Sequence, residues 1–202
     1  MTETTMALDP VEQPGRSRSE RLKDETREVH GLLDRRISDA GAFDTLEGYK
    51  LFLDMQHRVH QAVDPYYLDD DLEELIPGLK QRRRLELIER DMADLDMNAP
   101  ASLSPLVMPS PDPASAFGWL YVVEGSTLGA AVLLKRVKLL GLSADRGAAH
   151  LEGHPDGRGL HWRRFKSALD AAPFQREDEK RLTEAACTAF KFVRGLADDI
   201  FG

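Results

Sequence analysis

The chain has 202 residues, which is enough for one domain with a sizeable hydrophobic core. Its formal net charge of −8 argues against a general nucleic-acid-binding or anionic-membrane surface. Its single cysteine, Cys187, excludes an intramolecular disulfide and a cysteine-based zinc site. The N-terminus lacks the apolar core of a signal peptide, and no apolar run reaches the ~18–20 residues of a membrane span. We therefore expect a cytoplasmic protein.

Residues 1–16 show no hydrophobic period and contain two prolines, so we expect a mobile tail ahead of one domain over 17–202. A first helix is predicted over 17 to about 39, where Ser17 and Glu20 can form a capping box. Basic residues crowd its first turns: Arg18, Arg21, Lys23 and Arg27. The helix dipole favours acidic residues there, so we expect a mainly solvated face, part of which can meet an anion.

We predict a second helix over 44–64, a short helix over 66–75 and a longer helix over 77 to about 97. A connector with five prolines follows over 98–113. Asp44 and Glu47 are the expected capping pair of the second helix, and Pro65 is its expected end. The arginine triplet at 82–84 points in three directions around its helix, and we expect it to be solvated.

Residues 112–142 form a long apolar run that reads as one helix with Asp112 as its N-cap. Three glycines fall on one narrow stripe of this helix: Gly118, Gly125 and Gly129. Each costs roughly 1 kcal/mol relative to alanine, so something must approach the backbone closely there. Geometry alone favours another helix packed on the stripe. The alternative is a flat ligand that lies on bare backbone, with Arg136 near its negative group.

One or two helical turns are predicted over 143–150, followed by a glycine-rich loop and two helices over 160–171 and 175–200. No strand pattern, internal repeat or heptad array occurs in the sequence. The chain is therefore predicted to be an all-α bundle of roughly six to eight helices.

The histidines differ in what they can do. His57 and His60 are three residues apart and could share a metal, although the Glu-x-x-His repeats of a di-iron bundle are absent. His150 and His154 flank the glycine-rich loop and are expected to be exposed. His30 lies at the edge of an apolar face, where a lone histidine is usually a satisfied core residue. It could also serve as the single axial ligand of a heme, which further needs cations for its propionates and an open face for oxygen.

The basic residues near His30 and the glycine stripe supply those two further requirements. A glycine-lined face leaves no large side chain over the iron, and Ser126, next to Gly125, offers a hydrogen-bonding partner for water. By contrast, 125–129 does not match a nucleophile elbow, and no phosphate loop or dinucleotide fingerprint is present.

Two segments carry a family resemblance: LKDETREVHGLLD at 22–34 and, about ninety residues on, GWLYVVEGSTLGAAVLLKR at 118–136. Together and in this order they resemble the bacterial, biliverdin-producing heme oxygenases, in particular those that accompany bacteriophytochromes. GRGLHWRRFKSALDA at 157–171 and EAACTAFKFV at 184–193 are also similar to this family. The resemblance covers roughly 17–200.

The resemblance implies a single-domain all-α bundle that holds heme between the first helix and a glycine-kinked distal helix. His30 would be the axial iron ligand. The distal, catalytic positions would be Gly125, Ser126 and Gly129. The other heme-binding positions would be Arg27, Tyr121, Arg136, Lys166 and Phe190, of which Arg27 and Arg136 rest on helix geometry alone. Animal members carry an aspartate where this chain has Ser126, which leaves open the groups that hold the distal water.

The resemblance also implies that heme b is both cofactor and substrate. With O2 and an external electron donor, such as a ferredoxin or a flavoprotein reductase, it would be opened to biliverdin, carbon monoxide and ferrous iron. A bacteriophytochrome is one candidate acceptor of the biliverdin, and a monomer is the default. Two alternatives remain at this point: a non-catalytic heme carrier or sensor on the same fold, and an all-α enzyme that binds another flat heterocycle.

Overall fold

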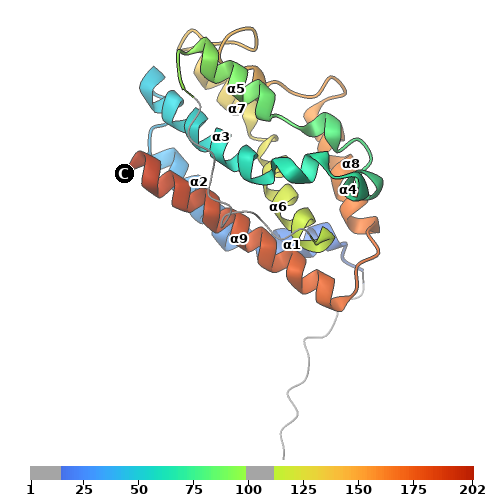
Figure 1. The fold of residues 1–202 in the computed structure, drawn as a ribbon. Coiled ribbons are helices and arrows are strands. Elements are labelled where there is room, and N and C mark those ends of the chain that lie inside the picture. The colour runs from blue at the N-terminus through green and yellow to red at the C-terminus, as the bar shows by residue number, and fades with distance from the viewer. Residues whose placement is uncertain (1–14, 99–111) are drawn as a thin grey trace, which may run out of the picture.

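The computed structural model describes residues 15–98 and 112–202, and within these ranges the chain is almost entirely helical (Figure 1). The elements are α1 (Arg18–Glu25), α2 (Arg27–Asp39), α3 (Leu46–Leu68), α4 (Asp70–Leu75), η1 (Lys80–Arg82), α5 (Leu85–Asp94), α6 (Pro113–Ser126), α7 (Ala130–Lys138), η3 (Ala149–Leu151), α8 (Arg158–Ala171) and α9 (Arg176–Phe201). The predicted all-α bundle is confirmed. These ranges hold nine α-helices rather than six to eight, because two helices that the sequence predicts as single are each broken in two.

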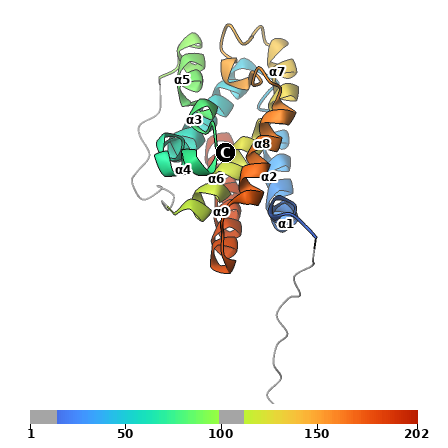
Figure 2. The ribbon, with the colours of Figure 1, turned by 90° about the vertical axis from the view of Figure 1, so that its right-hand side faces the viewer.

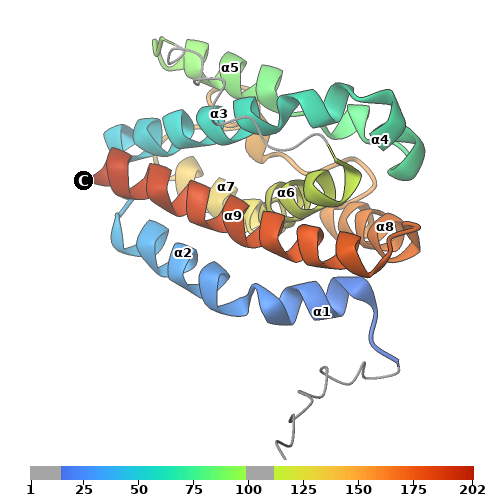
Figure 3. The same cartoon turned by 60° about the horizontal axis from the view of Figure 1, so that its bottom comes forward.

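The buried helix α6 lies at the centre of the molecule and packs along α9 (Figure 2). Figure 3 shows α3, α4 and α5 on one side of this pair, and α1 and α2 on the other. Helix α8 packs on α1 and α6. Every residue from Ala114 to Glu124 is buried, so α6 is the core around which the other helices gather.

The first predicted helix is broken at Thr26 into α1 and α2. The expected capping box of Ser17 and Glu20 is present. The buried hydroxyl of Thr26 donates to the carbonyl of Leu22 at 2.8 Å, and such back-bonding bends helices. Of the predicted tail, residues 1–14 lie outside the described residues, while Arg16 pairs with Asp24.

Both predicted ends of the second helix are wrong by a short distance. The N-cap of α3 is Thr45, whose hydroxyl accepts from the amide of Gly48 at 3.0 Å, and not Asp44. The helix also runs through Pro65 for one more turn to Leu68. A proline in a helix interior costs about 3 kcal/mol. Here the next two residues, Tyr66 and Tyr67, are buried in the core, and this packing offsets the local cost.

The helix expected over 77–97 is shorter and begins only at Leu85. The arginine triplet before it is not solvated, contrary to the prediction. Arg82 is only 3% exposed, Arg83 pairs with Asp64 at 2.6 Å, and Arg84 donates to the carbonyl of His150 at 2.7 Å. These tertiary contacts hold the segment as a 3-10 turn and a short extended stretch.

The glycine helix predicted over 112–142 is broken between α6 and α7, whose axes differ by 41°. Across the break, Thr127, Leu128 and Gly129 donate to the carbonyls three residues before them, as in a 3-10 turn. The hydroxyls of Ser126 and Thr127 bond the carbonyls of Val123 and Glu124 at 2.7 and 2.6 Å, which competes with the helical pattern. We refer to residues 125–129 as the distal break.

No single helix in the described ranges is long and apolar enough to cross a membrane; only the bent pair α6 and α7 passes that test of length and composition. The helical turns predicted over 143–150 occur only at the end of that range, where the 3-10 turn η3 begins at Ala149. Before it, residues 143–147 form a turn in which Ser143 bridges to Arg146 and Gly147. The two last predicted helices are confirmed as α8 and α9. The connector over 98–113 lies mostly outside the described residues.

Candidate active site

A cavity of about 820 Å³ lies between α1, α2, α3, the distal break, α8 and α9. This volume is within the range of small-molecule and cofactor sites. Eight of the nine site residues predicted from the sequence line it: His30, Tyr121, Gly125, Ser126, Gly129, Arg136, Lys166 and Phe190. The ninth, Arg27, does not line it. Its side chain is 74% exposed and pairs with Asp24.

His30 reaches the cavity from α2, and its side chain is 57% exposed. Its ring stacks on Phe190 of α9 with the centroids 5.1 Å apart and an angle of 28° between the planes. The Nε2 atom lies 3.4 Å from a carboxylate oxygen of Asp34, one turn later on the same helix. The imidazole is thus oriented by an aromatic contact and is open to a ligand in the cavity.

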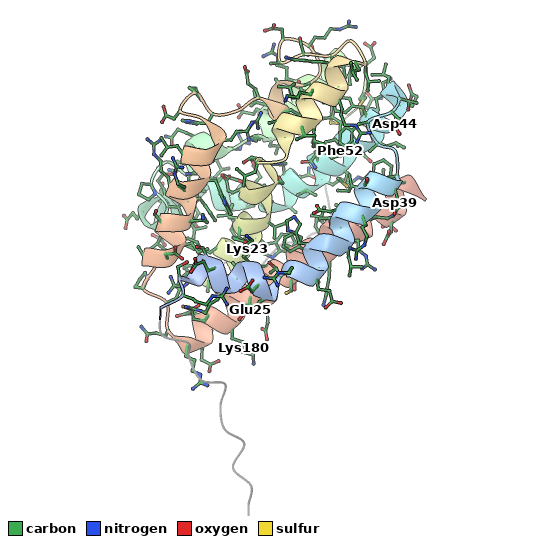
Figure 4. All side chains as sticks on the ribbon, turned by 180° about the vertical axis from the view of Figure 1, so that it is seen from behind. Lys23, Glu25, Asp39, Asp44, Phe52 and Lys180 are labelled. Carbon is green, nitrogen blue, oxygen red and sulfur yellow. The ribbon has the colours of Figure 1, made fainter. Side chains whose placement is uncertain are left out.

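Two lysines from different helices offer positive charge to the cavity. Lys23 of α1 and Lys166 of α8 both line it, and none of the ion pairs between described residues uses either of them. Figure 4 shows Lys23 on the side of α1 toward α6. Tyr121 of α6 also lines the cavity, and burial raises the pKa of its phenol although a hydrogen bond with Thr26 opposes this shift. Tyr121 is therefore a neutral phenol in the cavity wall, with Thr26 as its hydrogen-bond partner.

Arg136 of α7 lies at the end of the cavity near Asp44 and Phe52, which Figure 4 shows beside α7. Its guanidinium bonds a carboxylate oxygen of Asp44 at 2.7 Å and lies over the ring of Phe43, 5.2 Å from the centroid. Arg136 is therefore already paired, whereas the two lysines are not.

The glycine stripe has two different neighbourhoods. A Cβ at Gly118 would lie 2.5 Å from the carbonyl oxygen of Leu182, so this glycine permits α6 to pack on α9. A Cβ at Gly125 would have the indole of Trp162 as its nearest neighbour at 3.6 Å, and one at Gly129 would meet only the carbonyl of Ser126 at 3.5 Å. The packing interpretation therefore holds at Gly118, whereas Gly125 and Gly129 line the cavity, where the flat ligand stays a prediction.

A polar wall faces the cavity from α3, η3 and the segment before α5, and sequence reasoning missed most of it. It consists of Gln56, His60, Arg84 and His150. His150 is only 5% exposed, contrary to the prediction, and its Nδ1 lies 2.7 Å from a carboxylate oxygen of buried Asp91. Because Asp91 accepts there, Nδ1 carries the hydrogen and Nε2 is left as an acceptor.

Burial lowers the pKa of His60 to about 3, with smaller contributions from its neighbours His150 and Arg84, so the ring is neutral. The Nδ1 of His60 and the Nε2 of His150 are buried and bond no atom of the described residues. Buried polar atoms of this kind need water or a ligand as a partner. The wall therefore provides polar positions for ordered water or a polar ligand.

The alternative in which His57 and His60 share a metal finds no further ligand among the described residues. Among the described residues, no three His, Cys, Asp or Glu side chains gather so that they could hold a metal ion. His57 is 1% exposed and its Nε2 lies 3.5 Å from Glu89. A metal that brings its own planar ligand and needs one axial histidine remains compatible with His30.

These features define a class: an all-helical protein with one deep cavity suited to a large, flat, anionic ligand whose metal one histidine can hold. Comparison with known proteins specifies the family. The heme oxygenase family model matches residues 16–199, and the chain belongs to the heme oxygenase family of enzymes. The predicted resemblance is confirmed at the level of the bacterial heme oxygenases.

The similarity covers nearly the whole chain. Heme oxygenase PigA of Pseudomonas aeruginosa is 32% identical over 184 residues, which are 91% of this chain and 93% of that protein. The heme oxygenase of Neisseria meningitidis, solved with NO and CO bound, matches with a TM-score of 0.87 and 36% identity over 93% of this chain and 94% of its own. Heme oxygenase-1 of Synechocystis, solved with heme, has a TM-score of 0.73 at 14% identity over 91% and 92%, which shows a shared fold.

Proposed function

We propose that this chain binds heme b as both cofactor and substrate and, with O2 and electrons from an external donor, opens it to biliverdin, carbon monoxide and ferrous iron. One observation carries the proposal: a single cavity brings His30 of α2 together with the glycines of the distal break. The cavity volume, the glycine-lined wall and the unpartnered polar atoms all suit a heme with a diatomic ligand on one side.

On the proximal side, the neutral imidazole of His30 would hold the iron, since a histidine is the axial ligand through which many heme proteins bind oxygen. Phe190 would fix the plane of this ring by stacking on it. Ligation through Nε2 requires Asp34 to turn away, and the Asp34 side chain is 69% exposed and free to do so.

The two propionates would be held by Lys23, Lys166 and Tyr121. The ammonium groups supply charge, while the protonated phenol would supply a directed hydrogen bond by exchanging Thr26 for a propionate. Lys23 was missed from the sequence as a site residue although its position contains a signal. It precedes His30 by seven residues, or about two helical turns, and this spacing places the two near one face.

On the distal side, bound heme supplies the iron that activates O2 and the porphyrin carbon that is oxidised. Gly125 and Gly129 keep side chains away from this region. Because the Ser126 hydroxyl donates to the carbonyl of Val123, its oxygen can only accept from a distal water. The polar wall, with Arg84 as donor and neutral His60 as acceptor, would hold further water and supply protons through it.

We further propose that the chain acts in the cytoplasm and as a monomer. Its electrons would come from a ferredoxin or a flavoprotein reductase, and a bacteriophytochrome is one candidate acceptor of biliverdin.

The test is a hemin titration followed by reduction with ascorbate in air, with catalase present. We expect a histidine-type Soret band that decays into the broad red band of biliverdin. His30→Ala should lose the normal spectrum and reduce turnover more than about a hundredfold, because axial ligation sets the chemistry of the iron. His154→Ala, outside the cavity lining, is the control and should behave as the unchanged chain.

A stable heme spectrum that never decays would favour the carrier or sensor. No saturable binding, or full turnover in His30→Ala, would overturn the assignment of the site.

A further inference from the structure

A buried carboxylate sits directly before the distal break. Glu124 is the last buried residue of α6, and its side chain is 3% exposed. One carboxylate oxygen accepts from the Tyr67 hydroxyl of α3 at 2.7 Å, and the other accepts from Nη1 of Arg82 in η1 at 2.8 Å. Both oxygens of Glu124 are thus tied to elements outside its own helix.

Arg82 extends this network to α8. Its side chain is 2% exposed, and Nη2 donates to the carbonyl of His161 at 3.1 Å. The guanidinium also lies over the ring of Phe165, 5.9 Å from the centroid. The end of α6 is therefore connected through a single ion pair to η1 and α8, and through Tyr67 to α3.

A second, independent anchor holds the middle of the break. Arg158, in the first turn of α8, donates from Nη1 to the carbonyl of Thr127 at 2.9 Å and from Nη2 to the carbonyl of Leu151. Thr127 belongs to the segment where the helical hydrogen bonds give way to 3-10 bonds. Arg158 thus supplies a donor from outside to a carbonyl in a weakly bonded turn.

None of these four residues lines the cavity, yet each takes part in a polar contact with Glu124 or Thr127, the residues on either side of Gly125 and Ser126. A buried ion pair adds little net stability compared with apolar packing, but it constrains where its partners can lie. A helix with two glycines and two back-bonding hydroxyls can bend over a range of angles. The external bonds select one of them.

We propose that Glu124 and Arg158 are positioning residues that fix the place and angle of the distal break, with Tyr67 and Arg82 holding Glu124. On the function proposed above, on which this inference rests, the break determines how a bound diatomic ligand can bend. The network then governs which meso carbon of heme is opened, without touching heme itself.

The first test needs no heme. Tyr67→Phe removes one buried hydroxyl that donates at 2.7 Å, and Tyr49→Phe is a matched control. Tyr49 lies on the same helix, is also fully buried, and donates at 2.7 Å to the carbonyl of Gly147. We expect backbone amides of 125–132 to exchange about tenfold faster in Tyr67→Phe, Glu124→Gln and Arg158→Met, and at the native rate in Tyr49→Phe.

The second test uses the heme-loaded protein. The variants should keep a histidine-type Soret band but shift the infrared stretching frequency of CO on the ferrous heme and change the ratio of biliverdin isomers. Tyr49→Phe should change neither. Tyr67→Phe, the mildest substitution, decides the matter if Glu124→Gln does not fold.

Unchanged exchange at 125–132 in Tyr67→Phe and Arg158→Met would overturn the proposal. So would an unchanged isomer ratio in variants whose exchange has risen. Failure of the unchanged chain to bind or turn over heme would overturn the proposed function instead, and the exchange experiment would still decide whether these residues hold the break.

Discussion

Gly118 and Gly129 belong to one stripe of the sequence but should respond in opposite ways to a methyl group. In Gly118→Ala, the new Cβ would lie 2.5 Å from a backbone oxygen of α9, which cannot move without separating the two central helices. We expect a loss of about 2 to 3 kcal/mol in the free energy of unfolding. In Gly129→Ala the nearest atom is 3.5 Å away, and we expect a change within about 0.5 kcal/mol or a small gain.

Urea unfolding of the heme-free chain measures both values. Heme titration of the same variants separates helix packing from heme binding, since Gly129 lines the cavity and Gly118 does not. Equal destabilisation by the two substitutions would show that the stripe only packs helices.

Single residues of the site were predictable to the extent that helix periodicity places them. His30 and Gly125 occupy faces that a pitch of 3.6 residues defines, and both line the cavity, as does Phe190, which the family resemblance implied. The residues missed or misplaced, such as His150 and Arg84, lie in loops and short turns that have no period. Their burial depends on tertiary partners far away in the chain, which local pattern cannot indicate.

At the scale of elements, the position of η3, which carries His150, depends on one buried carboxylate. Asp91 of α5 is fully buried and accepts from the amides of Ala149 and His150 at 2.7 and 2.8 Å, besides the ring of His150. Asp91→Ala leaves three buried donors without a partner. We expect it to cost about 3 kcal/mol or more and to disorder η3.

Hydrogen exchange of the amides at 148–152 and urea unfolding check this prediction. Arg90→Ala, at an exposed position on the same helix, should leave both unchanged. Retention of native exchange at 148–152 in Asp91→Ala would mean that apolar packing, and not the carboxylate, holds η3.

Helix breaks were harder to predict than helices. The segments over 17–39 and 112–142 each satisfy one continuous amphipathic or apolar pattern, yet each is broken where a threonine or serine hydroxyl bonds a carbonyl in the preceding turn. Conversely, Pro65 does not end α3, because the two tyrosines after it are buried. The two breaks thus coincide with local hydroxyl bonds that an apolar pattern does not reveal, whereas at Pro65 tertiary packing outweighs a local cost of about 3 kcal/mol.

At the scale of the whole molecule, the fold class could be predicted from the sequence, because about seven apolar helical stripes in 202 residues permit few arrangements other than one bundle. The polar residues of the interior could not be predicted in the same way. Within the described residues, the core contains buried charged or titratable groups from several elements, among them Arg82, Asp91, Glu124 and His150. Each is tolerated only because its partner arrives from another helix.

The buried histidine His60 should make the stability of the whole molecule depend on pH. Burial lowers its pKa from 6.5 to about 3, with smaller contributions from the neighbouring His150, Arg84 and His57. Between these two pH values the unfolded chain binds a proton that the folded chain does not, so stability is greatest above pH 6.5 and is lost as the pH falls toward 3. Between pH 6.5 and 4.5 this single group should account for about 2 kcal/mol of the loss.

Urea unfolding at these two pH values, for the unchanged chain and for His60→Gln, isolates this contribution. The substitution lowers stability at pH 6.5 through lost packing, but it should reduce the difference between the two pH values by about 2 kcal/mol. His154→Gln, at a half-exposed position in the loop before α8, should keep the full difference. If His60→Gln also keeps the full difference in stability, then the pKa of His60 is not lowered on folding. The polar wall of the cavity would then carry a positive charge at pH 4.5 in place of an acceptor for water.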